Sequence, residues 1–181
     1  MPGVTGVIVA GGASSRMGQD KALLEIDGRS QLERTMKLLK SSGCEEVIVS
    51  RNDQGFIEDT IANRGPLGGV LSSLPYCNYD YVVIVPVDMP LLTLEVLRFL
   101  IEQKCASYFS CTPLPCLLPN NEKLADYLLQ QISAEDGNRS VRGLLEYMQA
   151  RSLEWQLTYQ LQNTNTPQQW RQALQYLGEV S

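Results

Sequence analysis

Apolar residues along this chain form short continuous runs that alternate with stretches of helical spacing. The runs Val4–Val9, Glu46–Ser50 and Tyr81–Val85 are brief and rich in β-branched residues, a pattern that predicts strands. The run Tyr81–Val85 is apolar throughout, as expected for a strand that is buried on both faces of a parallel sheet. We therefore expect Tyr81–Val85 to be a central strand.

The stretches between these runs have the spacing of amphipathic helices. Gln31–Lys40 places Leu32, Met36 and Leu39 on one face, which predicts a helix. Capping residues predict three further helices, after Thr93 to about Lys104, after Asn121 to about Ser133, and from a capping-box pattern at Thr166-Pro167. Strands alternating with helices predict a three-layer α/β fold with a mostly parallel sheet, formed by one domain over residues 1–181.

This fold class indicates where to look for chemistry. In such sheets a ligand lies at the carboxyl ends of the strands, near the point where the strand order reverses. The segments that follow the predicted strands are 10–21, 50–52 and 86–90. We expect the functional residues to lie in these segments.

Composition excludes several classes of function. The net charge is −5 and no long basic cluster occurs, which argues against general nucleic-acid binding. No apolar run is long enough for a transmembrane helix, and the N-terminal apolar run lacks the charged start of a signal peptide, so we expect no membrane association and a cytoplasmic protein. Histidine is absent, which excludes Ser-His and Cys-His catalysis and any metal site built on imidazole.

The five cysteines have no CxxC spacing. An odd number of cysteines without a secretory signal predicts free thiols, mostly buried. A metal or redox site among Cys105, Cys111 and Cys116 is the less favoured alternative.

The segment 10–21, AGGASSRMGQDK, has the parts of a phosphate-binding loop without a standard spacing. It matches neither the Walker motif nor the dinucleotide fingerprint. Gly11 and Gly12 nevertheless let the backbone approach a phosphate, and Arg16 and Lys21 supply two cations. The alternative is a tight glycine-rich turn with solvated charges.

Asp88 follows the most buried predicted strand. A carboxylate at this edge of the sheet suits a Mg²⁺ ion that also holds nucleotide phosphates, and the alternative is an aspartate that caps the next turn. Asn163 and Asn165 stand at alternate positions before the last helix, so both amides can face one site; otherwise they are polar residues leading into a helix cap.

Two other features are weaker. Glycines flank the proline of Gly65–Gly69, which indicates either an anion site at a helix start or a plain turn. Considered alone, Asp59 is expected to be a solvent-exposed charge.

In combination these segments resemble the molybdenum cofactor guanylyltransferases, which are Rossmann-like nucleotidyltransferases. VIVAGGASSRMGQDKALLEIDG is similar to their first signature, and GPLGG, VDMP and NTNTP to three later ones, in the same order along the chain. The similarity extends from Val4 to about Gln175. Two segments, 52–56 and 106–113, are shorter than in the family, and Thr112 replaces the usual His or Gln near the second-substrate pocket.

The resemblance implies specific roles for site residues. Lys21, Arg16 and Asp88 would be catalytic, and Asp88 would bind Mg²⁺. The nucleotide would contact Val9, Ala10, Gly11, Gly12, Lys21, Ser50, Asp59 and Asp88, and the second substrate would contact Arg139, Asn163 and Asn165.

The implied reaction transfers GMP from GTP to the phosphate of the molybdopterin cofactor and releases pyrophosphate. The resemblance also implies contacts with molybdoenzymes or cofactor-insertion proteins, and a monomer or weak homo-oligomer. Three alternatives stay open: a CTP-dependent molybdopterin cytidylyltransferase, a sugar- or alditol-phosphate nucleotidyltransferase, and a nucleotide-binding protein without catalysis.

Overall fold

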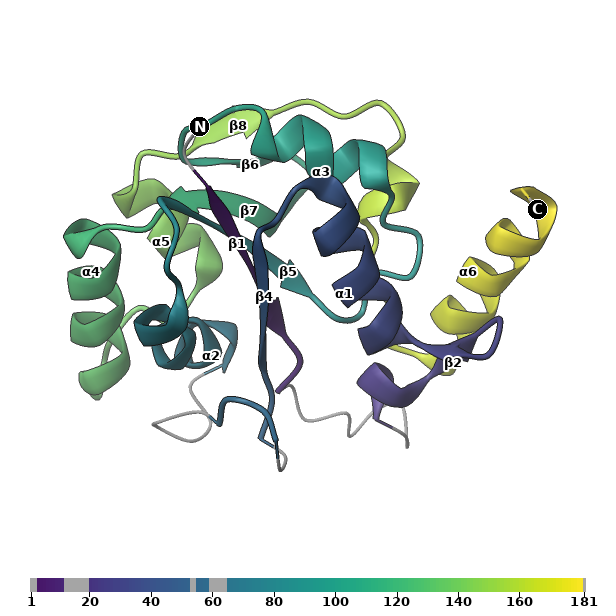
Figure 1. Ribbon diagram of the computed structural model, residues 1–181, viewed down its shortest axis with the longest axis horizontal. Helices are drawn as coiled ribbons and strands as arrows, with labels where there is room; N and C mark the ends of the chain where they lie inside the picture. Colours follow the sequence, from purple (N-terminus) through teal and green to yellow (C-terminus); the bar gives the residue numbers. More distant parts are fainter. Residues whose placement is uncertain (1–2, 12–19, 53–54, 59–64, 181) are drawn as a thin grey trace.

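The computed structural model describes residues 3–11, 20–52, 55–58 and 65–180 (Figure 1). Within these residues the backbone builds a six-stranded central sheet in the order β4-β1-β5-β7-β6-β8. The strands are β1 (Val4–Val9), β4 (Glu46–Ser50), β5 (Tyr81–Pro86), β6 (Ser107–Phe109), β7 (Thr112–Pro119) and β8 (Arg151–Leu153). Since β7 alone runs against its neighbours in this sheet, the prediction of a mostly parallel sheet is confirmed.

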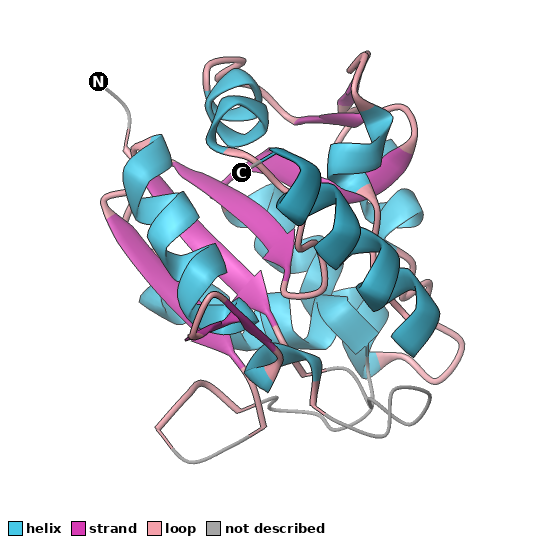
Figure 2. Ribbon diagram, turned by 90° about the vertical axis from the view of Figure 1, so that its right-hand side faces the viewer, coloured by secondary structure: helices cyan, strands magenta, loops and turns pink. Residues whose placement is uncertain are grey.

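Helices cover both faces of the sheet and make the predicted three layers (Figures 1 and 2). One face carries α1 (Gln31–Ser42) and α3 (Leu94–Ile101), and the other carries α2 (Gly65–Ser73), α4 (Glu122–Ser133) and α5 (Val141–Tyr147). The last helix is α6 (Pro167–Val180), and β2 (Glu25–Ile26) and β3 (Arg29–Ser30) form a separate small hairpin. Three short 3₁₀ helices complete the described part: η1 (Lys21–Leu23), η2 (Leu74–Tyr76) and η3 (Thr158–Leu161).

The apolar run of β5 is explained by burial on both faces. Val83 and Val85 pack into the cluster under α1 and α3, whereas Val82 and Ile84 pack into the cluster under α2, α4 and α5. Burial of each such side chain stabilises the fold by about 1.5–3 kcal/mol. Because successive side chains of a strand point to opposite faces, a central strand needs an apolar residue at every position.

The predicted helix boundaries are largely confirmed. Ser30 and Glu33 form a capping box at the start of α1, and Gly43 ends that helix with a φ of 104°. Thr93 and Asn121 accept backbone N–H bonds and cap α3 and α4. Helix α3 ends at Ile101, a few residues before the predicted end at about Lys104.

Strand β7 was missed from the sequence because it contains Pro113, Pro115 and Pro119. Proline lacks the N–H group that a central strand donates, so it argues against such a strand. In the structure Pro119 stands at the end of the ladder with β5, and Pro113 and Pro115 lie where the pairing with β6 is interrupted by a register shift.

All five cysteines are free, as predicted. Cys44 and Cys116 are buried and Cys77 is half-buried, but Cys105 and Cys111 are exposed because they lie in the turns on either side of β6. Among the described residues, no group of three or more His, Cys, Asp or Glu side chains could hold a metal ion. Over the same residues, no helix combines the length and the apolar character needed to cross a bilayer.

Candidate active site

The candidate site lies where the strand order of the sheet reverses. From β1 the chain passes to β4 on one side, and it later returns to β5 on the other side of β1. The carboxyl ends of β1 and β5 are therefore adjacent, and Val87 N–H donates to the Val9 carbonyl at 3.3 Å just beyond them. A crevice at this point of an α/β sheet is the usual place for a ligand.

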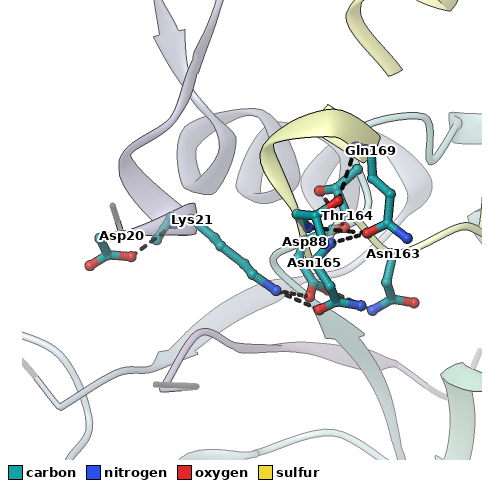
Figure 3. A network of polar contacts seen from close by, with 9 residues as sticks. Asp20, Lys21, Asp88, Asn163, Thr164, Asn165 and Gln169 are labelled. Carbon is teal, nitrogen blue, oxygen red and sulfur yellow. Dashed lines mark hydrogen bonds and ion pairs between the residues drawn. The ribbon is translucent and has the colours of Figure 1, made fainter. Parts of the chain in front are cut away.

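Lys21 and Asp88 meet at this point (Figure 3). Lys21 begins η1, and its Nζ lies 2.9 Å from Asp88 Oδ2. The two side chains are 18% and 15% exposed, so solvent screens their attraction less than that of a fully exposed pair. Two charges that were predicted on separate strand ends thus form one ion pair.

Asn163 and Asn165 join this pair from the segment before α6 (Figure 3). The Asn163 side-chain amide donates to Asp88 Oδ1 at 2.6 Å, and Lys21 Nζ donates to Asn165 Oδ1 at 2.6 Å. The prediction that both amides face one site therefore agrees with the geometry. The four side chains form a connected polar network.

Thr164 anchors the same segment to the end of β5 and was not predicted. Its backbone N–H and hydroxyl both donate to the Asp88 carbonyl, at 2.8 Å and 3.3 Å, and the residue is buried. The alternation that directs Asn163 and Asn165 toward the site directs Thr164 toward the protein, which is the signal that could have identified it.

Gln169 fixes the start of α6. It forms the predicted capping box with Thr166: the Gln169 N–H donates to the Thr166 hydroxyl at 3.2 Å, and Gln169 Oε1 accepts from Thr166 N–H at 3.1 Å. The same oxygen also accepts from Asn165 N–H at 2.7 Å. The cap therefore holds the backbone of Asn165, whose side chain binds Lys21.

Asp20 orients the short helix that carries Lys21. Its Oδ1 accepts the N–H of Ala22 at 2.9 Å, which caps η1, and its Oδ2 lies 2.8 Å from Nη2 of Arg51. No sequence pattern predicted a role for Asp20 or Arg51. Their adjacency to Lys21 and to the end of β4 was visible, but their pairing depends on the tertiary fold.

Three of the predicted nucleotide-binding residues, Val9, Ala10 and Gly11, lie at the end of β1. Val9 and Ala10 are half-buried and Gly11 is exposed, while Ser50 is only 1% exposed beside them, with its carbonyl accepting from Ala10 N–H at 2.9 Å. Gly11 is therefore accessible to a ligand, whereas the Ser50 side chain is not. Gly12, Arg16 and Asp59 lie outside the described residues, so their predicted roles stay predictions.

Arg139 has contacts of a different kind. It lies between α4 and α5, and its Nη2 donates to the carbonyls of Ala134 and Glu135, both at 2.8 Å. These bonds hold the turn that follows α4. The contacts of the described residues do not connect Arg139 to the network at Asp88, so a role with the second substrate stays a prediction.

Asn163 also lines a cavity of about 790 Å³. It lies between the β6–β7 turn and α6, and neutral polar side chains such as Thr112, Asn163 and Gln172 line it together with Tyr176. Thr112 was expected near the second-substrate pocket, and the structure places it in the wall of this cavity. The absence of charged side chains from the described lining suits a neutral polar group.

The network offers oxygen ligands of the kind that a divalent metal ion takes when a bound substrate completes its coordination. Mg²⁺ in phosphate-transfer sites is usually held by one or two carboxylates together with substrate phosphates, rather than by an all-protein cage. Asp88 offers the carboxylate, and Asn165 offers an amide oxygen within the same network. The described residues match this kind of site and do not form a dedicated metal cage.

Taken together, a mostly parallel sheet, a glycine-containing loop after its first strand and a Lys–Asp pair at its switch point define an α/β enzyme that acts on phosphate-bearing ligands. Residues 6–152 match the model of the MobA-like NTP transferase domain, and the chain belongs to this family.

Curated relatives agree with this assignment. The chain is 36% identical over 178 residues to the molybdenum cofactor guanylyltransferase of Xanthomonas euvesicatoria pv. vesicatoria, with 94% of each chain covered. It is 31% identical over 186 residues to the molybdenum cofactor guanylyltransferase of Yersinia pestis, with 92% of each covered.

Solved structures share the fold. The molybdopterin-guanine dinucleotide biosynthesis protein A of Archaeoglobus fulgidus superposes with a TM-score of 0.76 at 21% identity, covering 97% of this chain and 99% of that one. At this identity the likeness concerns the fold alone.

Proposed function

We propose that this chain is a single-domain nucleotidyltransferase that transfers GMP from GTP to the phosphate of the molybdopterin cofactor. The observation that carries the proposal is the Lys21–Asp88 pair at the switch point, joined by the two asparagines of NTNTP. This pair combines a cation that can bind phosphates with a carboxylate that can bind a metal ion. The names of its curated relatives supply the nucleotide and the acceptor.

The reaction needs no nucleophilic side chain. An oxygen of the acceptor phosphate attacks the α-phosphorus of GTP, a new P–O bond forms, and the bond to the bridging oxygen of the β-phosphate breaks, so that pyrophosphate leaves with the electron pair. The acceptor is already an anion, so no general base has to remove a proton from it. This agrees with a chain that contains no histidine. The protein therefore contributes positioning and charge stabilisation.

Lys21 and Asp88 divide this work between them. In the structure they neutralise each other, and substrate binding offers each a new partner: phosphate oxygens for Lys21 and a divalent metal for Asp88. A Mg²⁺ ion held by Asp88, when bound, would neutralise charge on the phosphate oxygens. Asn163 and Asn165 stay within hydrogen-bond reach of the pair and keep both side chains directed at the same point.

The second substrate would extend from this point into the cavity beside Asn163. The neutral polar lining of the cavity suits the pterin ring system, which offers hydrogen-bond donors and acceptors. The phosphate of the cofactor would stay at the Lys21–Asp88 end. In this arrangement Asn163 stands between the metal ligand and the cavity.

Nucleotide choice is the property that tests the proposal. Calorimetric titration with GTP, CTP, ATP and UTP in the presence of Mg²⁺ is expected to give the tightest binding for GTP. Preferential binding of CTP would contradict the guanylyl assignment and support the cytidylyl alternative. Binding of GTP without pyrophosphate release in the presence of molybdopterin would support a binding protein without catalysis.

We also propose a cytoplasmic enzyme that passes its product to molybdoenzymes or cofactor-insertion proteins and acts as a monomer or weak homo-oligomer. Five free thiols are typical of a reducing compartment. Light scattering of the purified chain would test the oligomeric state.

A further inference from the structure

A buried arginine, Arg51, lies next to the site and is not part of the network at Asp88. Arg51 directly follows β4, and its side chain is only 8% exposed. Its Nη2 lies 2.8 Å from Asp20 Oδ2, and its guanidinium carbon lies 5.7 Å from the centroid of the Phe56 ring. Its backbone N–H donates to the Ile57 carbonyl at 2.9 Å. Arg51 is therefore held from several sides, and its guanidinium binds the Asp20 carboxylate.

The carboxylate of Asp20 connects Arg51 to Lys21. One oxygen of Asp20 binds Arg51, and the other caps η1 through the N–H of Ala22. Lys21 is the first residue of η1, between Asp20 and Ala22. Movement of the Asp20 carboxylate would therefore move the backbone from which the Lys21 side chain extends.

We propose that Arg51 is a positioning residue for Lys21, acting through Asp20 and the cap of η1. The proposal rests on the proposed function, because it takes Lys21 as the group that contacts the phosphates. A bond between a buried guanidinium and a carboxylate is directional and stronger than one between neutral groups. It ties the end of β4 to the residue that follows the glycine-containing loop of β1, and so fixes Lys21 before a nucleotide binds.

The physical consequence concerns rate more than binding. Displacement of a catalytic group by about 1 Å can lower a rate by about 100-fold, while ground-state binding, which many contacts share, changes less. Loss of the Arg51–Asp20 bond should therefore lower kcat more than it raises KM for GTP. A residue that served only the stability of the fold would change the melting temperature and leave kcat unchanged in the folded protein.

Three variants test this connection. Arg51→Met is expected to lower kcat by about 10- to 100-fold and to change KM for GTP by less than about threefold. Arg51→Lys, which keeps the charge, is expected to retain more activity than Arg51→Met. Asp20→Asn keeps an oxygen for the cap but removes the charge, and because Asp20 is 41% exposed it tests the same bond without emptying a buried site. Arg98→Met, an exposed arginine of α3 that donates to the Ser41 carbonyl, is the matched control and should keep wild-type kinetics.

The decisive measurement combines Arg51→Met with Lys21→Ala. If Arg51 acts through Lys21, it has no lysine side chain left to position in the Lys21→Ala variant. Adding Arg51→Met to that variant should then lower kcat by less than about twofold. Full additivity would overturn the proposal, because Arg51 would then act independently of Lys21. Wild-type kcat in both Arg51→Met and Asp20→Asn would also overturn it.

The same cycle can be read from nucleotide binding by calorimetry, without any turnover. If the wild-type chain fails to transfer GMP, the proposed function fails, yet non-additive effects of Arg51 and Lys21 on binding of the preferred nucleoside triphosphate would still support the connection. Additive effects on binding would overturn it. The two failures are therefore distinguishable.

Discussion

Lys21 Nζ lies 2.9 Å from Asp88 Oδ2, although the two residues are 67 positions apart in the chain. Each residue follows one of two adjacent parallel strands, β1 and β5, and the sheet brings the ends of these strands together. Asn163 and Asn165, from a third part of the chain, bind the two members of the pair. The site therefore depends on contacts between segments that are far apart in the sequence.

Replacing Lys21 by Ala should lower turnover by about 100-fold or more, because the phosphates would lose a preorganised cation in the transition state. The fold should persist, since Lys21 is a partly exposed residue of a short 3₁₀ helix. Pyrophosphate release with GTP and molybdopterin measures the effect. Lys37→Ala, which removes an exposed lysine of α1, is the control, and near-normal turnover of the Lys21 variant would show that the assigned role is wrong.

Replacing Asp88 by Asn should raise the Mg²⁺ concentration needed for half-maximal activity by about tenfold or more. Removing a residue that only hydrogen-bonds to a metal ligand already weakens metal binding by about this factor, so loss of the ligand's own charge should have at least the same effect. Titration of activity against Mg²⁺ at saturating GTP measures it. Asp80→Asn removes a carboxylate before β5, at the opposite end of the same strand, and should leave the Mg²⁺ dependence unchanged. An unaltered Mg²⁺ requirement in the Asp88 variant would rule out Asp88 as the metal ligand.

The free energy of unfolding should fall at low pH because Glu46 becomes protonated and its hydrogen bonds weaken. Burial tends to raise the pKa of its carboxyl, but hydrogen bonds from the Asn78 backbone N–H, the Thr5 hydroxyl and the Asn78 amide outweigh this effect and lower the pKa. A carboxyl whose pKa is lower in the folded state stabilises the fold above its unfolded pKa of about 4.3, and this contribution is lost as the pH falls through the folded pKa.

The free energy of unfolding, measured in denaturant from about pH 7 down to about pH 3, should therefore decline more steeply in the wild type than in Glu46→Gln. Thr5→Val, which removes one of the hydrogen bonds, should give an intermediate decline. Equal slopes in the wild type and Glu46→Gln would contradict the assignment of the lowered pKa to Glu46.

The cysteines should separate into two classes of reactivity. Burial raises the pKa of Cys44 to about 11 and that of Cys77 and Cys116 to about 12, so these thiols carry almost no thiolate near neutral pH. Cys105 and Cys111 are exposed, and partial burial raises the pKa of Cys111. A thiol reagent at about pH 8 should label Cys105 first and Cys111 more slowly, and should reach the other three only in denaturant.

Mass spectrometry of labelled peptides identifies the modified residues. A Cys105→Ser, Cys111→Ser double variant should lose all rapid labelling of the native protein. Rapid labelling of Cys116 in the native state would mean that its part of the core opens readily.

Local patterns were sufficient for much of the fold. Strands β1 and β4 have the predicted limits because their apolar and β-branched residues leave little choice of conformation. The caps at Thr93 and Asn121 were identifiable because a cap depends on neighbours within one turn. Strand β7 was not predicted because it contains prolines. They are tolerated because Pro119 lies at the end of the ladder with β5 and the other two lie at the register shift in the ladder with β6.

The sequence by itself determined which chemical groups the site contains: a glycine-containing loop with Lys21, a carboxylate at Asp88 and a pair of asparagines, each next to a recognisable element. The tertiary structure decided which of these groups meet. The Lys21–Asp88 bond, the attachment of Thr164 to the Asp88 backbone and the Arg51–Asp20 bond join parts of the chain that no local pattern connects. The physical reason is that propensities and caps act over a few residues, whereas the order of strands in the sheet sets the contacts between strand ends.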